Sequence, residues 1–223
     1  VRLDGTKAQN DGRTKSMTDN LIPAIQSYAQ AVQFAEEEWA LRATLRMGDL
    51  FSTIAIITDN QRVAGLSGED RFRVAIASKS SVPNYLDKAK DIYKKNLDVG
   101  LSQNIDNVWI DSTGDRLLSA FLFKGRALEE LGQLYLQVPL PTEADGVSAE
   151  DLAQARAQLK SAADEKKAAA VENYREALNI AQTYYLNNPT RSRILTRLRE
   201  LAPDSPELQL QVPAKPRGNA KPG

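Results

Sequence analysis

The stretch AFLFKGRAL at residues 120–128 decides the fold, because ATLRMGDLF at residues 43–51 has the same pattern. In both stretches a glycine stands among bulky apolar residues. The two glycines, Gly48 and Gly125, lie 77 residues apart. Such self-similarity at a long, fixed spacing is the sequence signature of a repeat architecture.

A second matching pair follows the first. It consists of AKDIYKKNL at residues 89–97 and AVENYREAL at residues 170–178, and its tyrosines, Tyr93 and Tyr174, lie 81 residues apart. The order of the two pairs and the spacings within them agree to within a few residues. Units of a repeat protein bury their apolar faces only against each other, and such arrays usually display surfaces rather than perform chemistry.

Apolar residues recur with a helical period between two polar ends, which predicts an all-α fold. We expect the first helix to be capped by Thr18 or Asp19, and the second could be fused to it. Pro83 is expected to close an insertion at 59–82 that holds a helix capped near Ser67. The expected helices after the first cover residues 36–58, 84–100, 107–137 (with a break at 113–114 left open), from 148 toward 187, and 190–201.

The expected domain organisation has three parts. Residues 1–17 are polar and without period, so we expect a disordered or loosely docked segment. Residues 202–223 are rich in proline and are expected to form an extended tail outside the fold. The helical domain lies between them, with a partial unit at 18–35, units at 36–106 and 107–189, and a capping helix at 190–201.

Composition excludes several kinds of chemistry. The chain has 223 residues without histidine or cysteine, which rules out thiolate and imidazole metal sites, disulfides, and nucleophiles activated by histidine. Basic and acidic residues balance at 29 each, so the net charge does not steer the protein toward nucleic acid or an anionic membrane. No apolar run is long enough to span a bilayer. Because the chain begins at Val1, we expect a targeting segment to be missing; the partial unit that opens the helical domain suggests further repeats upstream.

The two pairs of motifs resemble tetratricopeptide (TPR) repeats. That family has a small residue on helix A, here Gly48 and Gly125, and alanine followed by an aromatic residue on helix B, here ending at Tyr93 and Tyr174. The resemblance implies an α-solenoid of antiparallel helix pairs, with insertions that make each unit about twice the usual length of about 34 residues. The closest likeness is to irregular, long-helix TPR proteins of bacterial cell envelopes and gliding machinery, which implies a cell-envelope or periplasmic location. The residues themselves leave the location open.

Two groups of residues are candidates for partner binding. Arg42, Arg46 and Asp49 share one face of the first helix A, and Phe123 and Arg126 lie at corresponding offsets in the second. In TPR proteins this face lines a groove where basic residues can hold a peptide carboxylate. An exposed face that binds nothing is the alternative. A second group is a basic patch, which is either a binding surface or the solvated face of a capping helix; it consists of Arg191, Arg193, Arg197 and Arg199.

The sequence predicts a non-enzymatic scaffold or structural subunit of a larger complex that binds protein partners and needs no cofactor or metal. The segment DSTGD at 111–115 lacks the acidic spacing of a calcium loop, so a helix cap or turn is the better interpretation. Trp39 and Trp109 are expected to pack at helix junctions, with interface anchors as the alternative. Two other functions remain open: a peripheral envelope subunit with a lost anchor, and an enzyme built without histidine or cysteine.

Overall fold

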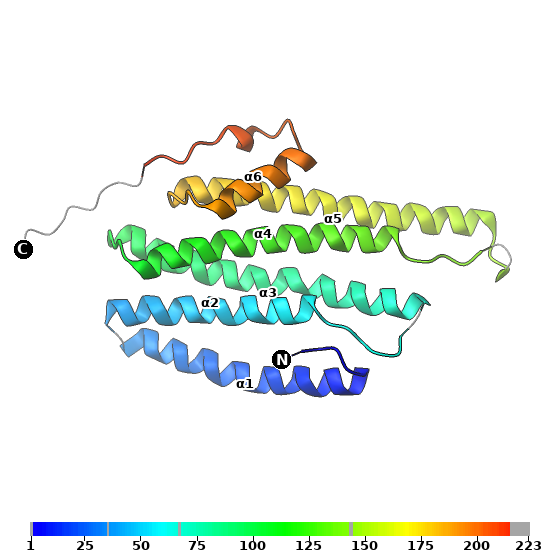
Figure 1. Ribbon diagram of the computed structural model, residues 1–223, viewed down its shortest axis with the longest axis horizontal. Coiled ribbons are helices and arrows are strands. Elements are labelled where there is room, and N and C mark those ends of the chain that lie inside the picture. The colour runs from blue at the N-terminus through cyan, green and yellow to red at the C-terminus, as the bar shows by residue number, and fades with distance from the viewer. Residues whose placement is uncertain (1, 35, 67, 143–144, 215–223) are drawn as a thin grey trace, which may run out of the picture.

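The computed structural model describes residues 2–34, 36–66, 68–142 and 145–214. Within these residues the chain is all-helical, as the periodicity predicts (Figure 1). Each long helix packs against the next in chain order. The helices are α1 (Lys7–Phe34), α2 (Glu37–Asp59), α3 (Gly68–Ser102), α4 (Val108–Leu136), α5 (Ala149–Thr183) and α6 (Pro189–Leu201), followed by the short 3-10 helix η2 (Pro206–Gln209).

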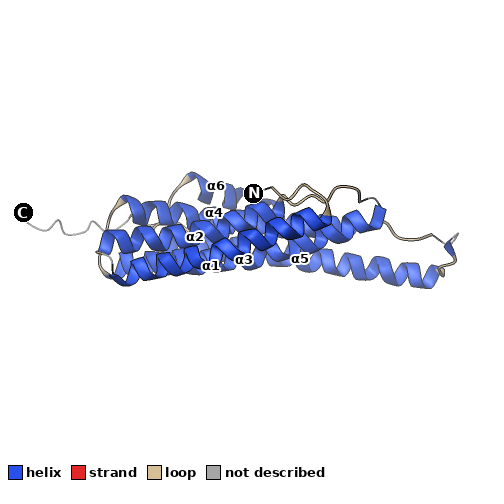
Figure 2. Cartoon of the chain, turned by 90° about the horizontal axis from the view of Figure 1, so that it is seen from below, coloured by secondary structure: helices blue, strands red, loops and turns tan. Residues whose placement is uncertain are grey.

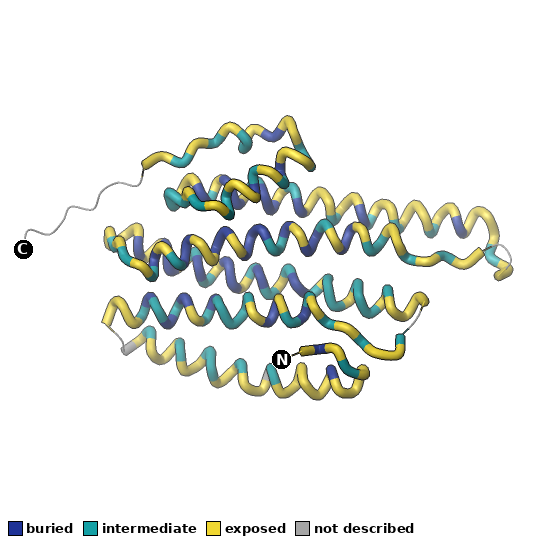
Figure 3. The backbone as a smooth tube through the Cα atoms, viewed as in Figure 1, coloured by how far each residue is buried: buried dark blue, intermediate teal, exposed yellow. Residues whose placement is uncertain are grey.

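The helices lie in two layers. Contacts join α2 to α4 and α4 to α6 in addition to the consecutive pairs. In Figure 2, α2, α4 and α6 lie toward one side of the molecule, and α1, α3 and α5 lie toward the other. Figure 3 shows that burial is concentrated in α2 to α5, while α1 and the projecting first half of α5 are largely exposed.

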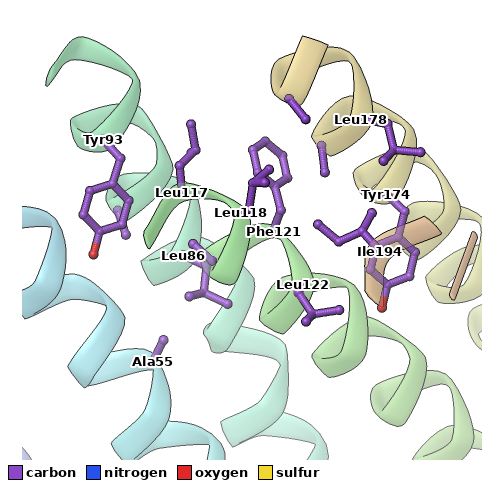
Figure 4. Packing of buried hydrophobic residues seen from close by; sticks show 14 of the residues in the cluster. Ala55, Leu86, Tyr93, Leu117, Leu118, Phe121, Leu122, Tyr174, Leu178 and Ile194 are labelled. Carbon is purple, nitrogen blue, oxygen red and sulfur yellow. The ribbon is translucent and has the colours of Figure 1, made fainter. Parts of the chain in front are cut away.

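The repeated glycines and tyrosines meet in the core. A Cβ atom added to Gly48 would lie 2.2 Å from Cε1 of Tyr93, and one added to Gly125 would lie 2.2 Å from Cε1 of Tyr174. Both tyrosines have side chains with 0% exposure, and Figure 4 shows them on α3 and α5. The absence of a side chain at each glycine therefore lets an aromatic ring lie against the helix backbone. Both halves of the described chain use this contact.

The turns after α3 and α5 also match. Asn104 and Tyr185, 81 residues apart, both have positive φ, at 53° and 58°. In each turn the next N–H donates to the carbonyl oxygen five residues earlier, at 2.8 Å, which is the bond that closes a Schellman motif. Three residues after each positive-φ residue, Asn107 and Asn188 accept backbone N–H groups and cap α4 and α6.

The N-terminal segment differs from expectation, because α1 begins at Lys7 rather than near Thr18 or Asp19. Residues before it are docked: the buried Leu3 accepts a hydrogen bond from the Arg62 N–H at 2.5 Å. The amide of Asn10, also buried, donates to the Arg62 carbonyl at 2.8 Å. These contacts lie in the loop before α3, far away in sequence, so local periodicity could not reveal them. The helix ends before α2 starts, so the two are not fused.

The helix boundary expected at Pro83 and the break left open at 113–114 are both absent. Pro83 lies inside α3, which runs without interruption from the expected insertion into the expected helix 84–100; the expected cap at Ser67 lies outside the described residues. The neighbours of Pro83 explain the continuity: Val82 and Leu86 have 0% exposure, and their burial offsets the lost backbone bond. Likewise α4 passes through Gly114, where a Cβ would lie 2.5 Å from Cδ2 of Leu186. That glycine permits close packing rather than a break.

The C-terminal segment also differs from the expected free tail. Residues 203–214, called the C-terminal strap below, turn back along α6 (Figure 1). Leu208, Leu210 and Val212 are partly buried against the core. Arg191 donates from a terminal guanidinium nitrogen to the Leu210 carbonyl at 2.6 Å. The alternation of apolar and polar residues anchors the strap despite its prolines, and the remaining residues of the expected tail lie outside the described ones.

Candidate functional site

A groove of about 660 Å³ lies between α2 and α4, and we call it the α2–α4 groove. Residues from α3 and α6 complete its lining. It contains four of the five residues that the sequence singled out as partner-binding candidates on α2 and α4. The lining consists of Arg46, Asp49, Ser52, Thr53, Ile56, Asp59, Asn60, Leu86, Arg116, Ser119, Ala120, Leu122, Phe123, Arg126 and Arg193.

Asp49 is the centre of the polar contacts in the groove. Its Oδ2 atom lies 3.1 Å from a guanidinium nitrogen of Arg46, and its Oδ1 atom lies 3.3 Å from Nε of Arg116. The Tyr93 hydroxyl donates to Oδ1 at 3.0 Å and lies 3.2 Å from Oγ of Ser52. The carboxylate is thus held by two helices and a buried phenol, which fixes both arginines at the rim.

Burial raises the pKa of Tyr93 well above its ordinary value, and the negative charge of Asp49 raises that pKa further. The phenol therefore stays protonated and keeps its hydrogen-bond donor at neutral pH. Tyr174, at the corresponding position, behaves in the same way: burial and the Glu129 carboxylate raise its pKa. Its hydroxyl donates to Glu129 at 2.7 Å. In both cases the tyrosine acts as a structural donor.

Arg126 and Arg193 are the two groove arginines that do not contact Asp49. Both are exposed, and among the described residues neither makes a hydrogen bond or an ion pair. They come from α4 and α6. An exposed guanidinium without a partner is available for a carboxylate or phosphate from outside the chain, and its planar fork can hold such a group with two hydrogen bonds.

The apolar part of the groove lies beside these charges. Ile56 is 50% exposed, and Phe123 is partly exposed. Leu86 and Leu122, both buried, lie beneath them. The groove therefore offers a binding molecule apolar area next to positive charge. Its two carboxylates, Asp49 and Asp59, are held by arginines and by Lys79.

Arg42, the fifth candidate, lies outside the groove. Its guanidinium stacks between two indole rings, 5.1 Å from the ring centroid of Trp39 and 5.0 Å from that of Trp109. Trp109 donates from Nε1 to Glu38 at 3.0 Å. Trp39 is 59% exposed, so it is not the packed junction residue that the sequence predicts. This cluster joins the first turns of α2 and α4.

The four arginines of α6 do not form one patch. Arg191 holds the C-terminal strap, and Arg197 binds Glu129 and Glu200. Arg193 lines the α2–α4 groove, whereas Arg199 is exposed. Two of the four guanidiniums are therefore occupied by structural contacts.

Sequence reasoning missed several groups around the groove. Arg116 lies outside the matching stretches of the two units, and only the folded structure brings it next to Asp49. Lys79 bonds Asp59 at 2.7 Å and also bonds Glu130. Burial lowers the pKa of Lys79, but the hydrogen bonds that its ammonium donates to the two carboxylates outweigh that effect and raise the pKa overall. Lys79 therefore stays charged and ties α3 to α2 and α4.

Comparisons with protein-family models, with curated proteins and with solved structures find no match. The tetratricopeptide resemblance accordingly stays a prediction. In the described part of the chain, no helix is long and apolar enough to cross a membrane. The same residues contain no group of three or more acidic side chains arranged to hold a metal ion.

Proposed function

We propose that this protein is a non-enzymatic interaction scaffold that binds a protein partner through the α2–α4 groove. The observation that carries the proposal is that Arg126 and Arg193 lie unpaired and exposed beside an accessible apolar surface in the same groove. Protein interfaces are enriched in arginine and aromatic side chains, and their binding energy concentrates where such anchors meet an apolar core.

The charge of the groove indicates the kind of partner. Four arginines and two aspartates line it, which leaves an excess of two positive charges although the whole chain is neutral. A segment that carries acidic side chains next to apolar ones would complement both features. The charges would steer the encounter and set specificity, while burial of Phe123 and Ile56 would supply most of the affinity.

The proposal includes a tetratricopeptide-like solenoid. Three observations support it: the paired contacts of Gly48 with Tyr93 and Gly125 with Tyr174, the matching turns after α3 and α5, and the two layers of helices. In a solenoid, α2 and α4 would be the A helices that line the inner surface. The long α3 and α5 would then carry the insertions that enlarge each unit.

The test uses the full chain as bait in its native extract, with cross-linking and mass spectrometry. Cross-links from a stoichiometric partner should fall on α2 and α4. Reversing the two free charges with Arg126→Glu and Arg193→Glu should weaken that partner's binding at least about tenfold, which corresponds to about 1.4 kcal/mol. The wild-type complex should also weaken as salt is added.

The matched control is Lys167→Glu with Arg199→Glu, which changes the net charge equally at exposed positions outside the groove. This variant should keep the partner at wild-type level. Equal loss in both variants would attribute binding to overall charge, and full retention by the groove variant would eliminate the groove. Recovery of the bait alone would eliminate the hetero-partner claim.

A further inference from the structure

The C-terminal strap is a segment docked on two helices of its own chain. It lies beside α5 and α6, at the opposite end of the helix order from α1 (Figure 1). Its apolar side chains, Leu208, Leu210 and Val212, point toward the core, and the intervening Gln209 and Gln211 are exposed. The surface beneath the strap therefore holds three apolar side chains, of which Leu208 comes from the 3-10 helix η2 and Leu210 and Val212 come from the residues after it.

Polar contacts give this recognition direction and register. Nε of Arg175 on α5 lies 3.1 Å from the hydroxyl of the buried Ser205 and 3.6 Å from the Glu207 carboxylate. Arg191 on α6 donates to the Leu210 carbonyl at 2.6 Å. Two arginines from different helices thus fix two points of the strap, so the surface holds one segment in one register.

The strap is joined to α6 through a short connection, in which Ala202 is partly buried and the next two residues are exposed. Pro203 and Asp204 are exposed, and Ala202 leaves the helical conformation with φ −148° and ψ 75°. The N–H groups of Leu208 and Leu210 bond to the carbonyls of Ser205 and Glu207, so the strap carries these two backbone bonds with it. Lifting the strap would break side-chain contacts and the two arginine contacts, but no strand pairing.

We propose that the surface under the strap accepts the strap of a second copy of this chain, so that two molecules exchange straps. The strap of a second copy has the same sequence, so it would restore every apolar and arginine contact in trans. Exchange changes only the path of residues 202–204. At low concentration the tethered strap wins because its effective concentration is high, and the exchanged dimer grows as protein concentration rises.

The experiment exploits the absence of cysteine from the chain. One full-length variant carries Ser192→Cys, next to Arg191, and another carries Gln211→Cys, next to Leu210; both positions are exposed. Mixing them with a short bismaleimide should yield a dimer whose cross-linked peptide joins 192 to 211, with a yield that rises with protein concentration. Adding Leu208→Asp and Leu210→Asp to the Gln211→Cys chain should reduce that yield at least about fivefold, since aspartate cannot replace the buried leucine contacts.

Two controls make the result decisive. A single chain with both Ser192→Cys and Gln211→Cys should cross-link within itself, which shows that the linker spans the docked pair. A mixture of Gln211→Cys with Lys167→Cys measures random collision. If the double-cysteine chain links internally while the mixture gives no more dimer than this collision control, exchange is ruled out. If the double-cysteine chain fails to link, the docked strap on which the proposal rests is itself ruled out.

Discussion

Gly48 and Gly125 are the residues on which the two halves of the core depend most directly. Each lies against the ring of a tyrosine that is fully buried in the core. A methyl group at either position must push the ring or separate two helices. Overpacking of this kind costs about 1–3 kcal/mol.

We therefore expect Gly48→Ala and Gly125→Ala each to lower the free energy of unfolding by about 1–3 kcal/mol in urea denaturation. Gly12 supplies the matched control, because it lies inside α1 and a Cβ there would meet nothing within 4 Å. Gly12→Ala should raise stability by about 0.5–1 kcal/mol, since alanine is the better helix former. Equal effects at all three glycines would show that the tyrosine contacts do not constrain the packing.

The candidate site was partly predictable at this scale. Arg46 and Asp49 share a helix face by their spacing, and Phe123 and Arg126 follow by the repeat, so these four could be found from sequence. Arg42 shares that face too, but the indoles of Trp39 and Trp109 hold it away. Tertiary packing alone brings in the remaining groove arginines, Arg116 and Arg193, and no local pattern marks them.

Among the elements, α3, α4 and α5 are joined by a cluster of charges. The side chain of Lys90 is 6% exposed, and its ammonium lies 3.0 Å from Asp87 and 3.4 Å from Glu176. It also lies 4.1 Å from the ring centroid of Phe121. Lys124 of α4 bonds Asp87 at 2.7 Å. Asp87 is therefore the carboxylate that both lysines share.

Asp87→Asn should lower the free energy of unfolding at pH 7 by about 1 kcal/mol, a modest figure because the Asp87 side chain is 43% exposed. Partial burial raises the pKa of Asp87, but the hydrogen bond from Lys124 and the charge of Lys90 outweigh it and lower the pKa below 3.8. The contribution is thus fully present above pH 3.8 and is lost as pH falls through the folded-state pKa.

Urea denaturation of the wild type and of Asp87→Asn from pH 7 to pH 3 measures this effect. The difference between their free energies of unfolding should become smaller toward pH 3. Asp91→Asn, at an exposed position on the same helix, should behave like the wild type throughout. A difference that stays constant with pH would contradict the assignment to the Asp87 charge.

Helix type and order were predictable, but several boundaries were not, for identifiable reasons. Pro83 normally predicts an end, yet the buried Val82 and Leu86 keep α3 continuous. The start of α1 depends on Asn10, whose partner lies in a loop 52 residues away. The strap follows a period of two within a proline-rich segment, a pattern that composition alone conceals. In each case a long-range contact overrides the local preference.

Across the whole molecule, stability should be unequal. Helix α1 packs mainly against α2, and among its described side chains only Asn10 is buried. Ile22 in its middle is 55% exposed, and Pro23 removes a backbone bond. The interior helices α3 and α4 each pack against helices on both sides. Local opening requires the least free energy where apolar contacts are fewest.

Hydrogen exchange followed by mass spectrometry should therefore show α1 exchanging faster than α3 and α4, with the second half of α5 among the protected segments. The first six residues of α1 should exchange more slowly than the stretch around Pro23, because Asn10 anchors them to the loop before α3. Uniform protection of α1 and α4 would mean that α1 is held by contacts other than those to α2.

The identical turns after α3 and α5 bear on how such a chain could change its length. Tyr185 does for α5 what Asn104 does for α3, and the distance between them is 81 residues. If a copy of residues 105–185 were inserted after Tyr185, the turns at both ends of the copy would be of the kind that the chain already forms at these two positions. An in-frame duplication within the gene could then extend the molecule by one step while both ends keep their present contacts.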